Sequence, residues 1–342
     1  MDRRRPIVID HVYLKNKVDK LLKVDSGHTP KALVLLEHKK EQKKGVVKAC
    51  NSLFFGDLIK SLMSGNSAYS VYFAKDIVGK KKKDVVIPER IRCVVKKMES
   101  PHVPYYNGVV GSRLANLLGV PVVYNMAYQK EFEPEFDEQE YDYLLSVDYL
   151  PNGHKEQSLL SLGMHFGSEN MLAGADSLED VMTEVDRGLR RMIKVGTIKN
   201  DLDCIEAYRE AMVQEYLFKN LLCEDGDYCS RNCNIVIAPN GSFYKAPCYD
   251  MELLFKGVRA TGFYQQVAEN DLIYLQQSMP DVLEDFLANC NKHLKSGAID
   301  RVMDNSIKTT DRGLNAKLIV KRNIERLTNI YKKVKNSPEM GD

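Results

Sequence analysis

Apolar positions follow a strand-like pattern in the first part of the chain. Short runs of β-branched and aromatic residues, separated by turn residues, predict strands over residues 32–36, 45–47, 70–73, 92–95, 120–124 and 143–150. Helical spacing predicts two short helices among them, over residues 51–63 and 111–118. Gly119 stands where a helix-ending glycine is expected. The first part is therefore predicted to be rich in β-structure.

The pattern changes after the turn sequence Pro151-Asn152-Gly153. Apolar residues then recur at helical spacing over residues 180–195, 204–222, 273–294 and 315–334. One hairpin interrupts these helices, with strands at 235–237 and 243–244 around Pro239-Asn240-Gly241. We find neither an alternating βαβ order nor a glycine-rich dinucleotide motif, which argues against a Rossmann fold. The expected fold class is α+β, in two parts.

Length and composition agree with a two-part globular chain. The 342 residues exceed the size at which a single core stops growing, and 44% are hydrophobic while 28% are charged. The 49 basic and 47 acidic residues nearly cancel to +2, so we expect no direct nucleic acid binding. No apolar run is long enough for a membrane span.

Targeting features predict the compartment. The apolar run behind the basic start is too short for a secretory leader, and the chain has eight cysteines. These features predict a cytoplasmic protein with reduced thiols. A secreted effector without a leader would have the same sequence features. The oligomeric state cannot be read from the sequence.

Three polar residues flank the hairpin of the second part. Asp227 and Asn232 are five positions apart in a loop between a long apolar helix and the hairpin, and Asp250 follows the hairpin. Phosphoryl transfer needs a carboxylate that orients the attacking hydroxyl, and an amide and a second carboxylate that hold Mg²⁺. Such hard oxygen ligands suit Mg²⁺. The arrangement predicts a phosphotransferase site.

The letters around these residues resemble a known family. Asp227-Tyr228-Cys229-Ser230-Arg231-Asn232 and Pro247-Cys248-Tyr249-Asp250 resemble the Asp-x-His-x-x-Asn loop and Pro-x-Tyr-Asp metal site of HipA-like bacterial serine/threonine kinases. The helical tail looks like that of the related CtkA-like kinases. The motif match covers about residues 216–255, and elsewhere only the order of elements is similar.

This resemblance implies a bilobal, protein-kinase-like fold with a β-rich N-terminal lobe over residues 1–150 and a helical C-terminal lobe over 151–342. It implies ATP and Mg²⁺ as cofactors and a serine or threonine of a protein substrate as acceptor. Asp227 would be the catalytic base, and Asn232 and Asp250 the Mg²⁺ ligands.

Further candidates concern the nucleotide. Lys96 ends an apolar-apolar-lysine run on a predicted strand, where kinases place the lysine that binds the ATP phosphates, although a solvent-facing lysine would read the same. The backbone from Val147 to Tyr149 is a candidate hinge that binds adenine, or a plain strand end. The best candidate for a phosphate loop is Gly65-Asn66-Ser67.

The sequence also departs from the kinase pattern. Kinases pair the lysine with a glutamate of the small-lobe helix, yet no glutamate occurs between Pro101 and Lys130. Cys229 replaces the histidine usual in the catalytic loop. Cys229 and Cys233 are spaced like one half of a zinc site, but a second pair is missing. An inactive kinase-like module that binds a nucleotide or a partner, and a kinase of small molecules or lipid headgroups, remain alternatives.

Overall fold

The computed structural model describes residues 31–37, 90–98, 103–123, 125–129, 142–147, 149, 153–166, 177–225, 228–251, 253–255, 261–306 and 311–336. The strands predicted at 45–47 and 70–73 and the helix predicted at 51–63 lie outside these ranges. So do four predicted site residues, which are Gly65, Asn66, Ser67 and Asp227.

The chain divides into two compact units. Unit 1 comprises Met1–Leu117, Pro121–Tyr149 and Arg301–Thr309, and unit 2 comprises Leu118–Val120, Leu150–Asp300 and Thr310–Asp342. Each unit is described by itself below. That the two parts are the lobes of a kinase stays a prediction.

Unit 1 contains an antiparallel sheet. Its strands are β1 (Lys31–Glu37), β2 (Arg90–Met98), β3 (Asn125–Gln129) and β4 (Asp142–Val147), in the order β1-β2-β4-β3. The predictions of strands at 32–36, 92–95 and 143–150 are confirmed, although β4 ends before residue 150. The strand expected at 120–124 is wrong, because the chain there forms only an isolated bridge at Val122 before β3 begins.

The helix α5 (Val103–Leu118) lies on this sheet and begins eight residues earlier than its sequence pattern predicts. Asn125 of β3 is buried and joins three elements. Its Nδ2 donates to the carbonyl of Gly108 at 3.1 Å, and Ser146 Oγ of β4 donates to its Oδ1 at 2.6 Å. A Cβ at Gly108 would meet the side chain of the buried Leu144, so glycine permits the close approach of α5 to β4.

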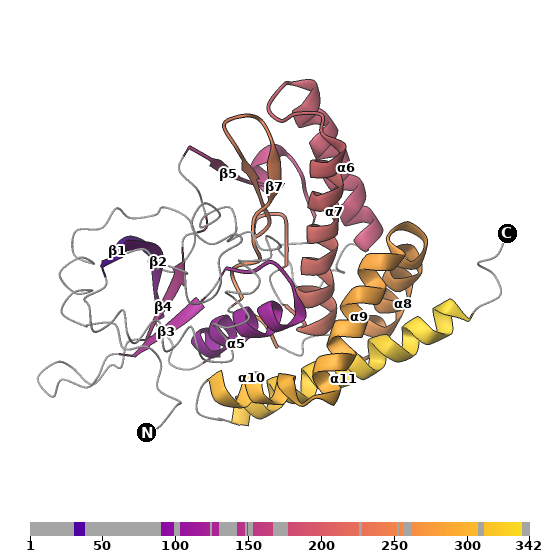
Figure 1. The fold of residues 1–342 in the computed structure, drawn as a ribbon. Helices are drawn as coiled ribbons and strands as arrows, with labels where there is room; N and C mark the ends of the chain where they lie inside the picture. The colour runs from indigo at the N-terminus through magenta and orange to yellow at the C-terminus, as the bar shows by residue number, and fades with distance from the viewer. Residues whose placement is uncertain are drawn as a thin grey trace, which may run out of the picture. The chain divides into compact units, whose positions relative to one another are not determined.

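Unit 2 is mainly helical (Figure 1). Its elements are β5 (Lys155–Ser158), the 3₁₀ turn η2 (Leu160–Leu162), α6 (Leu178–Lys194), α7 (Leu202–Tyr216), the π-helix η3 (Leu217–Leu222), β6 (Asn234–Ile237), β7 (Phe243–Lys245), α8 (Thr261–Ser278), α9 (Pro280–Lys295) and α11 (Asp311–Lys335). The helix α10 (Ala298–Ser306) spans the division between the two units.

Several predictions for this part are confirmed. The helices expected over 180–195 and 315–334 form as α6 and α11, and the expected hairpin forms as β6 and β7. The side chains of Ser177 and Asp201 cap the first turns of α6 and α7. The single helix predicted over 273–294 is wrong. The chain leaves helical geometry at Met279, and Pro280 starts α9, because proline cannot supply the backbone donor that a continuing helix requires.

The helices α7 and η3 form the centre of unit 2. Tyr208, Met212 and every residue of η3 are buried, and α7 lies against β7. Asp271 of α8 links two further helices, since its carboxylate accepts hydrogen bonds from the backbone nitrogen of Leu178 at 2.8 Å and from Tyr216 Oη at 2.7 Å. Within the described part of the chain, no helix combines the length and apolarity that crossing a membrane requires.

Candidate functional site

The site residues predicted from the motif lie on both sides of the β6–β7 hairpin. Asn232 precedes β6, is 7% exposed, and donates its backbone N–H to the carbonyl of Cys229 at 3.0 Å. Asp250 follows β7 and is half-buried. The ladder between the strands continues beyond β7, since Ala246 N donates to Asn234 O at 2.9 Å. Both candidate metal ligands therefore leave the hairpin at its open end.

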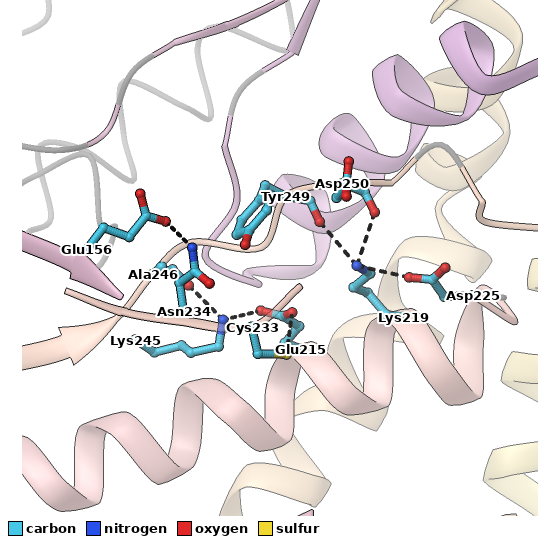
Figure 2. Close-up of polar contacts among 10 residues, drawn as sticks. All are labelled: Glu156, Glu215, Lys219, Asp225, Cys233, Asn234, Lys245, Ala246, Tyr249 and Asp250. Carbon is cyan, nitrogen blue, oxygen red and sulfur yellow. Dashed lines mark hydrogen bonds and ion pairs between the residues drawn. The ribbon is translucent and has the colours of Figure 1, made fainter. Parts of the chain in front are cut away.

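A buried lysine connects the two sides of this region (Figure 2). Lys219 lies in the middle of η3, and its side chain is 0% exposed. Its Nζ is 2.9 Å from Asp225 Oδ2 and donates to the carbonyls of Tyr249 at 3.1 Å and Asp250 at 3.2 Å. Asp225 stands two positions before Asp227. The ammonium group of Lys219 thus contacts both segments of the candidate site. One is the segment that precedes the proposed base Asp227, and the other contains the proposed metal ligand Asp250.

The charge of this lysine is stabilised by its partners. Burial by itself lowers the pKa of Lys219, but the surrounding groups together outweigh that effect, first among them the carboxylate of Asp225, and the pKa lies well above its usual value. Lys219 is therefore a buried ammonium ion, and each of its contacts is a charge-assisted interaction.

A second buried ion pair holds the end of β7. Lys245 Nζ lies 2.6 Å from Glu215 Oε2 and donates to the carbonyl of Ala246 at 2.9 Å. The thiol of Cys233 donates to the other oxygen of Glu215 at 3.7 Å. Glu215 and Lys219 are four positions apart, about one helical turn, so successive turns of α7 and η3 bind the chain on either side of residue 246 (Figure 2).

Three residues near these contacts have left-handed backbone geometry. Glu224, Asp250 and Phe255 have φ values of 50°, 58° and 61°. The segments also bond directly, since Phe255 N donates to Cys223 O at 2.7 Å. A side chain with a Cβ is strained in this conformation, and such residues concentrate at functional sites. The geometry at Asp250 is maintained by the surrounding contacts.

The C-terminal helix fixes the start of the loop. Glu224 is 4% exposed, and its Oε1 accepts hydrogen bonds from Arg322 Nη2 at 2.7 Å and from Asn323 Nδ2 at 2.9 Å. Asn323 also donates to the carbonyl of Leu222 at 3.0 Å. These bonds from α11 hold the end of η3, and therefore the beginning of the loop that contains Asp227.

The cysteines of this region are buried thiols. Burial raises the pKa of Cys223, Cys233 and Cys248, which keeps them protonated at neutral pH. Thiolates are the form that binds metals, and the described residues include no group of three or more His, Cys, Asp or Glu side chains placed to hold a metal ion. Asn232 and Asp250 offer amide and carboxylate oxygens, and this donor set fits Mg²⁺ in chemical type.

The nucleotide-binding candidates belong to unit 1. Lys96 lies in β2, where it pairs with Lys31 of β1 and with Leu144 of β4. Val147 is the last residue of β4, and Tyr149 is half-buried. The helix α5 contains no acidic residue along its whole length, so it has no glutamate to pair with the lysine. The nucleotide roles of these residues stay predictions.

The buried charges of unit 2 were not predicted from the sequence. Glu215, Lys219, Asp225 and Lys245 belong to no recognisable motif, and charged residues usually face solvent. One signal was present. Lys219 and Asn220 interrupt the otherwise apolar stretch of η3, whose run leaves no polar face on which a lysine could reach water.

Comparison with known proteins finds similarity among solved structures. No protein-family model matches the chain, and no curated protein matches it. Among solved structures, the Helicobacter pylori proinflammatory kinase CtkA is similar, with a TM-score of 0.45 and 13% sequence identity over 71% of this chain and 90% of that chain. At this level of similarity, the functional proposal has to rest on the residues of the site.

Proposed function

We propose that this chain is an ATP- and Mg²⁺-dependent phosphotransferase of the HipA-like kinase type, acting on a serine or threonine of a protein. The observation that supports the proposal best is the contact of Lys219 with Asp225 and with the carbonyls of Tyr249 and Asp250. Two sequence segments that resemble the two halves of a kinase site are joined there at one buried group.

Each candidate residue has a distinct task in this proposal. Asp227 orients the acceptor hydroxyl and accepts its proton, while the oxygens of Asn232 and Asp250 hold Mg²⁺. When held there, Mg²⁺ would neutralise negative charge on the phosphates. Lys96 binds phosphate oxygens, with Gly65, Asn66 and Ser67 as the phosphate loop and the backbone from Val147 to Tyr149 as the adenine site.

The cysteines at positions 204, 223, 229, 233, 248 and 290 are free thiols. We propose on this basis a reducing, cytoplasmic compartment.

The test is a transfer assay with labelled ATP and Mg²⁺ on the purified chain. Asp227→Ala and Asp250→Ala should each lower transfer by about 100-fold or more, since proton transfer and metal binding each contribute at that scale. Asp285→Ala serves as the control, because Asp285 is an exposed carboxylate on α9 and should retain full activity.

The acceptor is identified by comparing protein, inositide and aminoglycoside acceptors in the same assay. Labelling of protein on serine or threonine supports the stated class. Labelling of only small molecules or lipid headgroups would transfer the proposal to the second alternative of the sequence analysis.

One observation favours a different function. Because α5 has no acidic residue, Lys96 has no helix glutamate as a partner, which is the expected condition of an inactive module. Saturable ATP binding without transfer to any acceptor would establish such a binding module and refute the kinase.

A further inference from the structure

We propose that Lys219 is a positioning residue for the metal site, which sets the direction of the Asp250 carboxylate through the backbone of Asp250. This inference rests on the proposed function, since it assigns to Asp250 the role of a Mg²⁺ ligand. It adds a residue that the kinase-like motif does not contain.

The ammonium of Lys219 has three close partners. Asp225 Oδ2 forms an ion pair with it at 2.9 Å, and the carbonyls of Tyr249 and Asp250 accept hydrogen bonds from it at 3.1 Å and 3.2 Å. Two of these acceptors belong to consecutive peptide groups. Holding the carbonyls on both sides of the Asp250 Cα fixes how the backbone passes through that atom, and hence the direction in which its Cβ leaves the chain.

The backbone of Asp250 is stabilised by such support. Its φ of 58° lies in a sparsely populated region, which aspartate enters more readily than most residues with a Cβ, and surrounding contacts help to maintain it. Lys219 supplies two of those contacts from a side chain that water does not reach. Without the ammonium, we expect this peptide to relax and the carboxylate to leave its position.

The helix that carries Lys219 is itself unusual. A π-helix is rare and occurs mostly as a single turn at functional sites, and η3 covers six residues. The backbone bond that closes its end spans six positions, since Asp225 N donates to the carbonyl of Lys219 at 2.8 Å. Asp225 therefore contacts Lys219 through both its main chain and its side chain. These two contacts fix the position of the ammonium group that binds residues 249 and 250.

Lys245 provides a matched control. It is also a buried lysine in a close ion pair, but its contacts are Glu215 and the carbonyl of Ala246, four positions before Asp250. Replacing either lysine by methionine shortens the side chain by one heavy atom, keeps its unbranched apolar stem, and leaves one buried carboxylate without its ammonium. The two variants therefore share the loss of stability and differ in whether Asp250 is held.

The experiment measures metal binding rather than turnover. Mn²⁺ is titrated into the full chain with a non-hydrolysable ATP analogue, and free Mn²⁺ is followed by electron paramagnetic resonance, for wild type, Lys219→Met and Lys245→Met. We expect Lys219→Met to weaken Mn²⁺ binding by about 10-fold or more, as is typical when a residue that orients a metal ligand is lost. Lys245→Met should stay close to the wild-type value.

A double variant separates positioning from folding. Lys219→Met with Asp225→Asn removes the orphaned charge, so its melting temperature should recover towards that of the wild type while its Mn²⁺ binding stays weak. Equal Mn²⁺ binding by the two methionine variants, or Mn²⁺ binding that recovers together with the melting temperature, would overturn the proposal. If the wild-type chain itself shows no saturable Mn²⁺ binding with the analogue, the proposed function fails, and the role of Lys219 fails with it.

Discussion

The ion pair of Lys245 with Glu215 allows a quantitative prediction of stability. Both side chains are 2% exposed, and the pair is 2.6 Å apart. Lys245→Met leaves the carboxylate of Glu215 buried beside the weak thiol donor of Cys233, which is 3.7 Å from its Oε1. Removing one partner of a buried pair costs about 3–5 kcal/mol, because the other charge stays desolvated.

That cost corresponds to a measurable change in melting temperature. At about 2–4 °C per kcal/mol for a unit of this size, we expect Lys245→Met to melt roughly 10 °C below the wild type. Differential scanning calorimetry and urea unfolding of the ligand-free chain would both report it. The direction does not depend on the proposed activity, so this prediction tests the buried charges alone.

The double variant Glu215→Met with Lys245→Met provides the control. Replacing a whole buried pair by apolar side chains of similar length is often close to neutral, so this chain should melt within a few degrees of the wild type. A single variant that loses less than about 1 kcal/mol would refute the reasoning. So would a double variant as unstable as the single one, since an orphaned charge could not then be the cause.

Three further predictions concern unit 2. The free energy of unfolding should fall above about pH 9, because burial raises the pKa of thiols such as Cys223 and Cys248. Above the unfolded pKa of about 8.5, the native state binds more protons than the unfolded state. Each such thiol then lowers the free energy of unfolding by about 1.4 kcal/mol per pH unit. When urea unfolding is measured at increasing pH, Cys248→Ala should reduce the dependence of the unfolding free energy on pH by the contribution of one thiol. An unchanged pH dependence would contradict the prediction. Asp271→Ala should cost about 2–4 kcal/mol in thermal unfolding, because a backbone N–H and a tyrosine hydroxyl lose their acceptor, and Asp271→Asn, which keeps one oxygen, should cost less. Gly188→Ala should lower the free energy of unfolding by about 1–3 kcal/mol although alanine favours helices, since the new Cβ would overlap the buried Met164. The loss should be smaller when Met164 is also replaced by alanine. A Gly188→Ala chain that is more stable than the wild type would disprove the overlap.

The parts of the fold that sequence predicts are those with local causes. The hairpin of β6 and β7 follows from alternating apolar residues around a Pro-Asn-Gly turn, in which Gly241 has a φ of 83° that other residues adopt only with strain. The helices α6 and α11 have long apolar stripes, and the cap of α6 at Ser177 lies beside the stripe that it starts. No distant contact is needed to recognise these elements.

Elements whose limits depend on tertiary contacts were predicted less well. The apolar spacing of α8 and α9 continues across Pro280, so periodicity alone joins two helices that the proline separates. The strand β5 has the sequence Lys-Glu-Gln-Ser, which has no strand propensity, and it forms because it pairs with β6 over residues 234–237. An apolar run also failed at 120–124, where the sheet instead pairs the more polar β3.

The candidate site also combines features that local sequence predicts with features that depend on distant contacts. Asn232 and Asp250 are recognisable because their spacing to a hairpin is local, but the contacts that hold Asp250 come from Lys219, which is 31 positions away, and the end of β7 is held by Glu215, which is 30 positions from Lys245. Both partners lie on α7 and η3, one turn apart. Glu215 holds the chain at Lys245, five positions before Asp250, whereas Lys219 holds the carbonyls on both sides of the Asp250 Cα. In the proposed metal site, the direction of the Asp250 carboxylate would therefore be set by Lys219, a residue outside the motif. Asp227, Asn232 and Asp250 would then be insufficient for that site without a buried lysine on the preceding helix.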